Sequence, residues 1–377
     1  MSEKLEIRLC PLAEAPALMS FIDRHWRSGH ILSRDEALLR WQFAPARLAG
    51  AAADELSVLL ACRGGKIVGM LGLIPFEFNF RGRRAAGAWL ANWLALPEVT
   101  GAGLTLMETA RKLGCEARFA FGIGQAVEGL YGRMGFEVLP RCPRWVAVLD
   151  APAACELIAR ANPAASAEAV DAVARQYCIV DPEDADGKVA EAFGELGGQW
   201  NRCWETRFAP RLVGGCRDAA YINWRYVNHP RFHYEKCFAY ADDPAQPTGL
   251  AIWRIEPVRD MPHKVLRIVE FLADGPAAVA LARAVLAAGR RARAALADFY
   301  CTCPAAAAAL EDAGFRRHEP APDRPAIPAR FQPLDGAEDT IRGAFGLGAV
   351  WRKETGPLLT RADFYVTKSD DDMDRPN

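Results

Sequence analysis

The sequence lacks the features that mark several large classes of protein. Its 46 Lys and Arg residues are balanced by 47 Asp and Glu residues, which argues against nucleic acid or an anionic membrane surface as the main partner. No apolar run is long enough to cross a bilayer, and the opening segment MSEKLEIRLCP has no signal-peptide core. We therefore expect a cytoplasmic protein with no membrane span.

Metal and redox motifs are also missing. The eleven cysteines are scattered without a CxxC pair, and the closest two are Cys301 and Cys303. The six histidines include no HExxH motif. This pattern indicates reduced thiols in a cytoplasmic protein and no metal site.

Two nucleotide-binding loops are excluded by their spacing. A phosphate-binding Walker loop needs GxxxxGK followed by Ser or Thr, and a dinucleotide fingerprint needs three glycines in GxGxxG. The segment LALPEVTGAGLTLMETA, residues 94–110, offers two glycines and no lysine.

What the chain does contain is an internal repeat. RDEALLRWQF at residues 34–43 and RDAAYINWRY at residues 217–226 share Arg-Asp, the tryptophan and the final aromatic residue at identical spacing. Each copy is followed by a predicted hairpin, a crossover helix and a closing Gly-Phe. Because 377 residues exceed one ordinary core, we expect two copies of one domain. The repeated Arg34/Arg217 and Trp41/Trp224 are interpreted as structural.

The predicted boundaries follow from this repeat. Residues 1–150 form the first domain, residues 151–198 a linker with helical segments, and residues 199–377 a second, degenerate copy. The final segment, KSDDDMDRPN, is charged and is interpreted as a solvated terminus.

Periodicity in the first domain predicts an α/β (α+β layered) fold with mixed twisted sheets flanked by helices. Strands are expected at residues 5–9, 88–96 and 119–123, with a hairpin of strands 58–62 and 66–80. Helices are expected at residues 17–27, 34–43, 104–113 and 126–134, with Ser33 as an N-cap.

The Gly-rich turn predicts an anion site. Pro97 ends strand pairing because it has no N–H, and Gly101 and Gly103 permit a tight turn with positive φ. The first N–H groups of the helix that follows have no partner within that helix. Together with the positive end of the helix dipole they can hold a diphosphate.

This segment, followed by LYGRMGF at residues 130–136, resembles the GNAT superfamily of N-acetyltransferases. The resemblance implies acetyl-CoA as co-substrate and tandem GNAT-like domains. Thr100, Thr105 and Gly124 depart from the family pattern. The resemblance implies that the coenzyme diphosphate binds the main chain at the helix start and that the pantetheine arm lies along the strand edge, pairing with Leu94 and Leu96. The implied coenzyme-binding residues are Leu94, Ala95, Leu96, Gly101, Ala102, Gly103, Leu104 and Thr105.

The resemblance also assigns a general acid, Tyr131, which protonates the departing thiolate. The base is not fixed by the motif. The strand offers Asn92 and no carboxylate, so His30 is the first candidate and Glu77 another. Residues expected to line the acceptor site are His25, Trp26, Glu77, Asn92 and Trp93. In the second copy Leu310 replaces the tyrosine, so that copy is expected to be structural or acceptor-binding.

Three functions are consistent with these patterns. The first is acetyl transfer to a small polar amine, with a nucleotide-linked amino sugar of the surface-glycan or pseudaminic type as the specific expectation. The second is an aminoacyl or acyl transferase of the peptidoglycan-bridge type, and the third is a non-catalytic acyl-CoA-binding protein.

Overall fold

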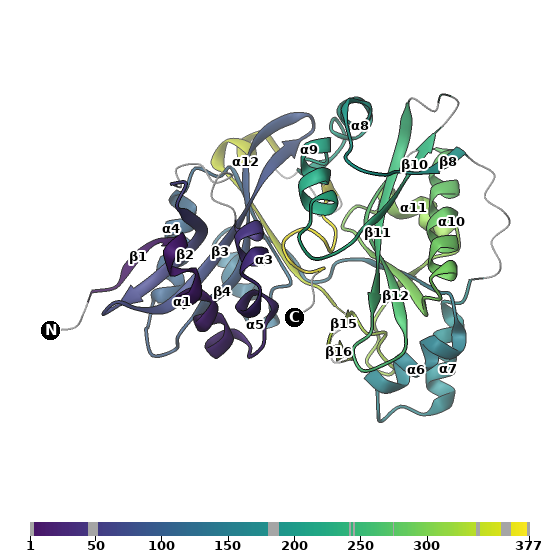
Figure 1. Cartoon of the computed structure of the whole chain (residues 1–377), viewed down its shortest axis with the longest axis horizontal. Helices are drawn as coiled ribbons and strands as arrows, with labels where there is room; N and C mark the ends of the chain where they lie inside the picture. Colours follow the sequence, from purple (N-terminus) through teal and green to yellow (C-terminus); the bar gives the residue numbers. More distant parts are fainter. Residues whose placement is uncertain are drawn as a thin grey trace.

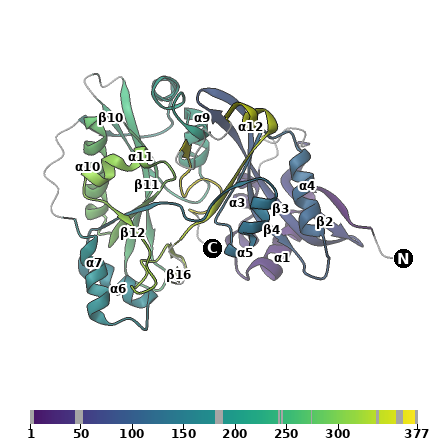
Figure 2. The same cartoon turned by 180° about the vertical axis from the view of Figure 1, so that it is seen from behind.

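The computed structural model describes residues 4–43, 52–179, 188–240, 243, 246–273, 275–336, 340–355 and 363–374. The chain folds into two mixed sheets flanked by helices, which lie side by side with the last part of the chain between them (Figures 1 and 2). The expected fold class is confirmed. None of the described helices is both long and apolar enough to cross a membrane.

The first sheet is built around the predicted hairpin. Its strand order is β1-β2-β3-β4-β5-β17-β6, and β9, which pairs with β18, also pairs with β3. The strands are β1 (Glu6–Pro11), β2 (Glu55–Arg63), β3 (Lys66–Phe80), β4 (Arg83–Ala95), β5 (Ala117–Phe121), β6 (Glu137–Leu139), β9 (Val213–Gly215), β17 (Gly343–Leu347) and β18 (Phe364–Tyr365).

Alternation along β2 sends side chains to two separate cores. Val58 and Leu60 pack toward α1 and α3, whereas Leu59 and Ala61 pack toward α4. Helices therefore cover both faces of this sheet (Figures 1 and 2). The helices are α1 (Ala15–Phe21), α2 (Ile31–Arg34), α3 (Glu36–Gln42), α4 (Ala102–Lys112), α5 (Gln125–Arg133) and α12 (Ala349–Thr355), and a π-helical segment (Ile22–Trp26) extends α1.

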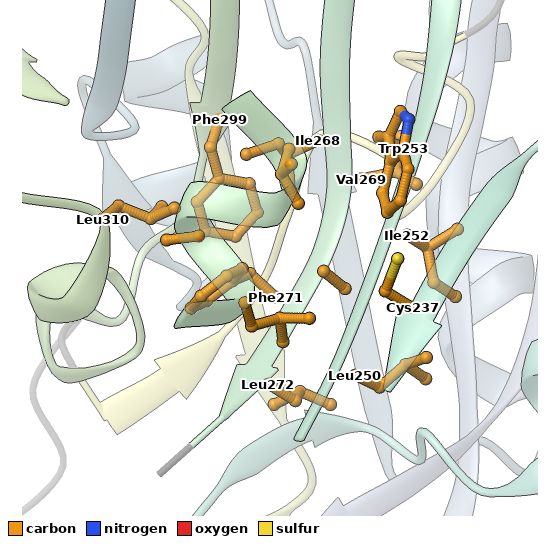
Figure 3. Packing of buried hydrophobic residues seen from close by; sticks show 14 of the residues in the cluster. Cys237, Leu250, Ile252, Trp253, Ile268, Val269, Phe271, Leu272, Phe299 and Leu310 are labelled. Atoms are coloured by element: carbon orange, nitrogen blue, oxygen red, sulfur yellow. The ribbon is translucent and has the colours of Figure 1, made fainter. Parts of the chain in front are cut away.

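The second sheet has the order β14-β7-β13-β12-β11-β10-β8. Large apolar groups of its buried side, such as Phe271 and Phe299, pack with Leu310 of the helix α11 (Figure 3). The strands are β7 (Arg144–Val148), β8 (Lys188–Glu191), β10 (Glu235–Tyr240), β11 (Pro247–Pro257), β12 (Lys264–Ala273), β13 (Leu296–Tyr300) and β14 (Arg316–His318), with a small separate pair β15 (Arg330–Phe331) and β16 (Leu334–Asp335). The helices are α6 (Ala151–Ala161), α7 (Ala167–Gln176), α8 (Gly198–Cys203), α9 (Ala219–Ile222), α10 (Pro276–Arg291) and α11 (Pro304–Asp312).

The two sheets repeat one connection. In the first, β4 leads through α4 to the parallel strand β5, and in the second β12 leads through α10 to the parallel strand β13. The repeated tryptophans meet where the two halves touch: the rings of Trp41 and Trp224 stack with centroids 5.0 Å apart. Both rings also pack against the core of the first half, so Trp41 lies against its own core and Trp224 against that of the other half.

The halves also exchange strands. The strand β7 leaves the first half and lies between β13 and β14, and β17 returns from the second half to lie between β5 and β6. Boundaries at residues 150 and 199 therefore do not coincide with the sheets. The expected linker also contributes a strand, because β8 pairs with β10 at the edge of the second sheet.

Two local expectations are corrected. The N-cap of α3 is Asp35, whose carboxylate accepts a hydrogen bond from the N–H of Leu38 at 3.0 Å, and Ser33 lies inside the preceding helix α2. The final segment, residues 368–377, was expected to be a solvated terminus. Residues 366–374, which we call the strap, instead run buried between the halves, and Ser369 and Asp370 are almost fully enclosed.

Candidate active site

The strands β4 and β5 separate after a short stretch of pairing. They pair in parallel at Gly87–Ala117, Ala88–Arg118 and Trp89–Phe119, and no further pair follows among the described residues. The remainder of β4, from Leu90 to its end at Ala95, thus has an edge that β5 does not cover. An uncovered edge in a buried setting presents main-chain groups that a ligand can satisfy.

A bulge in β4 shapes this edge. The register with β3 shifts between Met70 and Gly72, and opposite this shift Asn92 has a positive φ of 50°. Asparagine is one of the few residues that adopts this conformation readily. The next residue, Trp93, donates its indole N–H to the carbonyl oxygen of Gly103 at 3.1 Å, which ties the bulge to the start of α4.

Main-chain alternation identifies which residue faces the open edge. The N–H of Leu96 donates to the carbonyl of Val68 at 2.9 Å, so Leu96 pairs with β3. In an antiparallel ladder, the N–H and C=O groups of successive residues point alternately toward the partner strand and away from it. Leu94 therefore also pairs with β3, and the N–H and C=O groups of Ala95 point to the open side. Leu94 and Leu96, at which ligand pairing was predicted, thus direct their main chain to β3, and Ala95 is the residue whose main chain faces the open edge.

The start of α4 has the geometry of an anion site. Gly101 is its N-cap with a positive φ of 84°, whereas Gly103 is an ordinary helical residue. The N–H of Ala102 donates to Val99, and that of Thr105 donates to Gly101. The described part of the chain supplies no acceptor for the N–H groups of Gly101, Gly103 and Leu104, so these three are the donors available to a ligand.

A cavity of about 300 Å3 lies beside the open edge. It is bounded by β4, by the loop after β5, by α5, by the end of the π-helical segment, by β15 and by the strap. The lining residues are Trp26, Arg27, Leu90, Ala91, Asn92, Trp93, Phe121, Gly122, Ile123, Gly124, Val127, Tyr131, Arg330, Asp371, Asp372 and Met373.

Tyr131 reaches this cavity from α5 as an almost fully buried phenol. Its ring packs edge-on against Trp93 and Phe136, with centroids 5.8 and 5.1 Å away. Burial raises the pKa of Tyr131, and the negative charge of Asp371 raises it further. The phenol is therefore a proton donor throughout the neutral range.

The predicted acceptor residues divide into two groups. Trp26, Asn92 and Trp93 line the cavity, and Trp26 leaves 42% of its surface exposed at this position. His25 does not line it and instead packs on Phe21 with ring centroids 4.9 Å apart.

Neither proposed base lies in this cavity. His30 is buried as the N-cap of α2, and its Nδ1 accepts a hydrogen bond from Leu32 at 3.3 Å. Glu77 lies in a separate cavity of about 510 Å3 and pairs with Arg84 at 2.6 Å. Arg84 stands near the beginning of β4, whereas Tyr131 lies beside its end. The structure thus gives His30 a capping role and Glu77 a role in an ion pair.

The strap supplies the residues that the sequence did not indicate. Asp371 and Asp372 were read as part of a solvated tail, yet both line the cavity. Their position depends on how residues far apart in the chain pack, for which the sequence carries no local signal. In the part of the chain that is described, no group of three His, Cys, Asp or Glu side chains is placed to hold a metal ion.

Part of the chain matches a known protein family. Residues 39–139 match the model of the acetyltransferase (GNAT) domain family, which covers the hairpin, the start of α4 and Tyr131. None of the curated proteins matches the sequence.

Solved structures share the fold of the whole chain. A GCN5-related N-acetyltransferase from Anabaena variabilis is 14% identical with a TM-score of 0.55, covering 92% of this chain and 74% of that one. The corresponding enzyme from Kribbella flavida is 13% identical with a TM-score of 0.51, covering 92% and 71%. An N-myristoyltransferase from Saccharomyces cerevisiae, solved with myristoyl-CoA and inhibitors, is 9% identical with a TM-score of 0.51, covering 91% and 81%.

Proposed function

Because residues 39–139 carry a GNAT acetyltransferase domain, we propose that this acyl-CoA-dependent enzyme transfers acetyl from acetyl-CoA to the amine of a small polar acceptor. One observation carries the proposal. The open edge of β4, the free N–H groups at the start of α4 and the phenol of Tyr131 surround one cavity or adjoin it.

Each part has a defined task. The N–H groups of Gly101, Gly103 and Leu104 bind the diphosphate, helped by the positive end of the α4 dipole. The main chain at Ala95 pairs with the amides of the pantetheine arm, as an added strand would. These contacts direct the thioester toward the splay between β4 and β5, where Tyr131 stands.

Tyr131 then acts as the general acid. Attack of the amine nitrogen on the thioester carbonyl forms a C–N bond and breaks the C–S bond. The phenol donates its proton to the departing sulfur, and its raised pKa keeps it protonated until that step. The proton that the nitrogen loses on forming the amide restores the phenol.

For the acceptor we propose a nucleotide-linked amino sugar. Trp26 offers an exposed indole at the cavity, against which a sugar or base ring can stack. Arg27 and Arg330 line the same cavity and offer guanidinium groups to phosphate oxygens.

We assign the second half a structural or acceptor-binding role. Its counterpart of the α4 turn has Gly275 followed by Pro276, which has no N–H to offer a phosphate. Its counterpart of Tyr131 is Leu310, a fully buried apolar residue. At these two described positions, this half therefore reproduces neither the donor set nor the general acid of the first.

The test is release of free CoA thiol from acetyl-CoA in the presence of a UDP-linked 4-amino sugar. We expect amine-dependent release that requires the intact chain. A flat trace across nucleotide-linked amino sugars, with turnover of other amines, would reject the sugar and keep the acetyltransferase. Turnover only with aminoacyl donors would favour the peptidoglycan-bridge class.

A further inference from the structure

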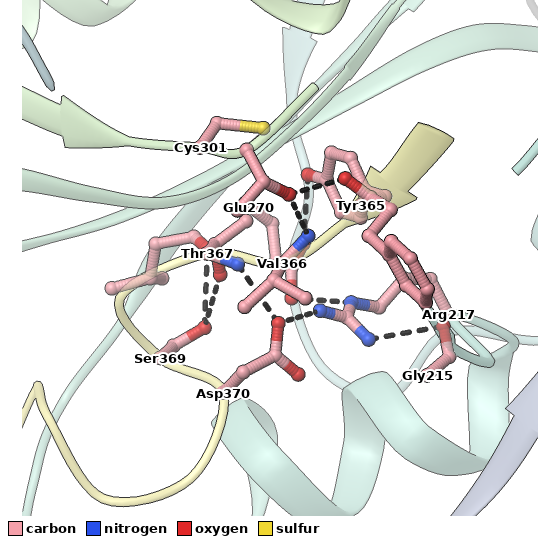
Figure 4. A network of polar contacts seen from close by, with 12 residues as sticks. Gly215, Arg217, Glu270, Cys301, Tyr365, Val366, Thr367, Ser369 and Asp370 are labelled. Carbon is pink, nitrogen blue, oxygen red and sulfur yellow. Dashed lines mark hydrogen bonds and ion pairs between the residues drawn. The ribbon is translucent and has the colours of Figure 1, made fainter. Parts of the chain in front are cut away.

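The strap distributes its acidic residues between the two halves. Asp370 pairs with Arg217, which also donates to Glu270 at 2.7 Å in a fully buried network (Figure 4). Asp374 pairs with Arg225 and accepts a hydrogen bond from the hydroxyl of Tyr234 at 2.6 Å. Both anchors belong to the second half. They hold the two ends of the short stretch 371–373, which contacts the first half through Asp371.

Asp371 lies between these anchors, and its side chain contacts the first half instead of the second. Its carboxylate accepts a hydrogen bond from the N–H of Phe121, at the end of β5, at 3.2 Å. Its backbone has a positive φ of 61°, which is uncommon for a residue other than glycine and costs energy. A strained residue held from both sides is a feature of functional sites.

The loop after β5 is shaped to receive the strap. Gly122 has a positive φ of 72°, and a side chain there would collide with the sulfur of Met373. Met373 and Asp371 thus approach the backbone closely at the point where β5 has separated from β4. The carboxylate of Asp371 is brought to the wall of the cavity that Tyr131 also lines.

We propose that Asp371 is the catalytic base of the acetyl transfer, an inference that rests on the proposed function. The Asp371 carboxylate takes one proton from the acceptor ammonium and passes it to water. The neutral amine then attacks the thioester, and Tyr131 protonates the sulfur. Asp371 and Tyr131 thus form a base and acid pair in one cavity, and β4 itself needs no carboxylate.

The surroundings of Asp371 are consistent with Asp371 as the base and Tyr131 as the acid. The charged and titratable groups that line the cavity with it are Tyr131 from α5, Arg27 after the π-helical segment, Arg330 from β15 and Asp372 on the strap. The carboxylate of Asp371 helps to keep Tyr131 protonated.

The test compares Asp371→Asn with Asp260→Asn in the full chain. Asp260 is exposed in the turn between β11 and β12 and has a φ of 63°, so it is a matched aspartate in the same conformation. Titration calorimetry measures acetyl-CoA binding. Thiol release measures turnover with a UDP-linked 4-amino sugar, with ethylamine as a generic amine and with hydroxylamine, whose nitrogen is unprotonated at pH 7.

We expect Asp371→Asn to bind acetyl-CoA within about threefold of wild type and to lose about 10²- to 10⁴-fold in kcat with the basic amines. Its kcat/KM should follow ionisation of the amine itself, so that activity recovers as pH rises. Hydroxylamine turnover should fall far less. Asp260→Asn should match wild type throughout, and Asp371→Glu, which keeps the charge, should exceed Asp371→Asn.

Other results would overturn the assignment. Basic-amine turnover within threefold of wild type and an unchanged pH profile would remove Asp371 as the base and leave the proposed function standing. An equal loss with hydroxylamine, or Asp371→Glu less active than Asp371→Asn, would indicate a structural role instead. If the wild-type chain fails to bind acetyl-CoA, the proposed function itself fails and the base falls with it.

Discussion

At the scale of single residues, the site depends on a phenol whose surroundings prevent ionisation. Tyr131 is enclosed by Trp93 and Phe136 and lies near the negative charge of Asp371. Both burial and the carboxylate raise its pKa, so the phenol holds its proton through the range in which an amine can be acetylated.

We therefore predict that Tyr131→Phe lowers kcat by about 10²-fold or more while acetyl-CoA affinity stays within about twofold of wild type. The hydroxyl acts on the departing sulfur, and the ring keeps its packing in the variant. Thiol-release kinetics and calorimetry measure the two effects. Tyr240→Phe on β10, in the second sheet, is the matched control. An unchanged kcat in the variant would contradict the role of Tyr131 as the acid. If the wild-type protein binds acetyl-CoA but shows no turnover, it is a non-catalytic acyl-CoA-binding protein.

Some site residues could be predicted from the sequence and others could not. Tyr131 was found because it stands at a fixed distance from Gly135 in a local motif. Trp26 and Asn92 were found because they lie on the segments that border the strand opening. Asp371 was missed because a run of acids near the end of a chain is usually solvated, and its burial depends on two distant arginines. His30 was misplaced because a histidine in a polar loop gives no sign that it caps a helix.

At the scale of elements, the junction of β4 and α4 makes the proposed diphosphate site. Gly101 permits the left-handed turn, and Trp93 fixes the first turn of α4 to the bulge in β4. Gly103 has no such conformational need. A side chain there would make ordinary contacts of 3.4 to 3.6 Å with Trp93 and Ala95.

This difference allows a sharp comparison at one position. Gly103→Asp should abolish measurable acetyl-CoA binding, because a carboxylate would stand among the N–H groups that hold the diphosphate. Gly103→Ala fits the available space and should keep affinity within about threefold. Titration calorimetry on both variants decides the matter. Equal affinity for the aspartate variant and wild type would place the coenzyme elsewhere.

The elements themselves were largely predictable, and their partners were not. The hairpin of β2 and β3, the strand β4 and the helices α4 and α5 all occur where periodicity and the Gly turns placed them. Local sequence cannot say that β7 leaves its own half or that β17 enters the other. Both are short apolar strands that would satisfy either sheet equally well. The same limit applies to β8, which sits in a segment whose composition resembles a linker.

At the scale of the whole molecule, a neutral histidine lies where the halves meet. His229 packs on Trp41 with ring centroids 4.3 Å apart, and its Nδ1 accepts hydrogen bonds from the N–H groups of Arg231 and Phe232, both at 3.1 Å. Burial and then the charge of Arg225 lower the pKa of His229 to about 3.

The sign of the pH effect follows from this shift. Below the ordinary histidine pKa of about 6.5 the unfolded chain takes up a proton that the folded chain refuses until about pH 3. The stabilisation by neutral His229 is complete above pH 6.5 and is lost as pH falls. We predict a loss of about 2 kcal/mol in the free energy of unfolding between pH 7 and pH 5.

Urea unfolding of the full chain at both pH values measures this loss. In His229→Gln the difference between pH 7 and pH 5 should shrink to what the other groups contribute. His233→Gln, at an exposed histidine four residues further along, should behave as wild type. A pH dependence that stays the same in the His229 variant would remove this histidine as its source.

The reciprocal exchange of β7 and β17 bears on how such a chain arose. Two identical subunits that trade a terminal strand form a swapped homodimer, and joining the end of one to the start of the other would give this topology in a single polypeptide. Each half of this chain therefore needs the other to complete its sheet, because β7 joins β13 to β14 and β17 joins β5 to β6.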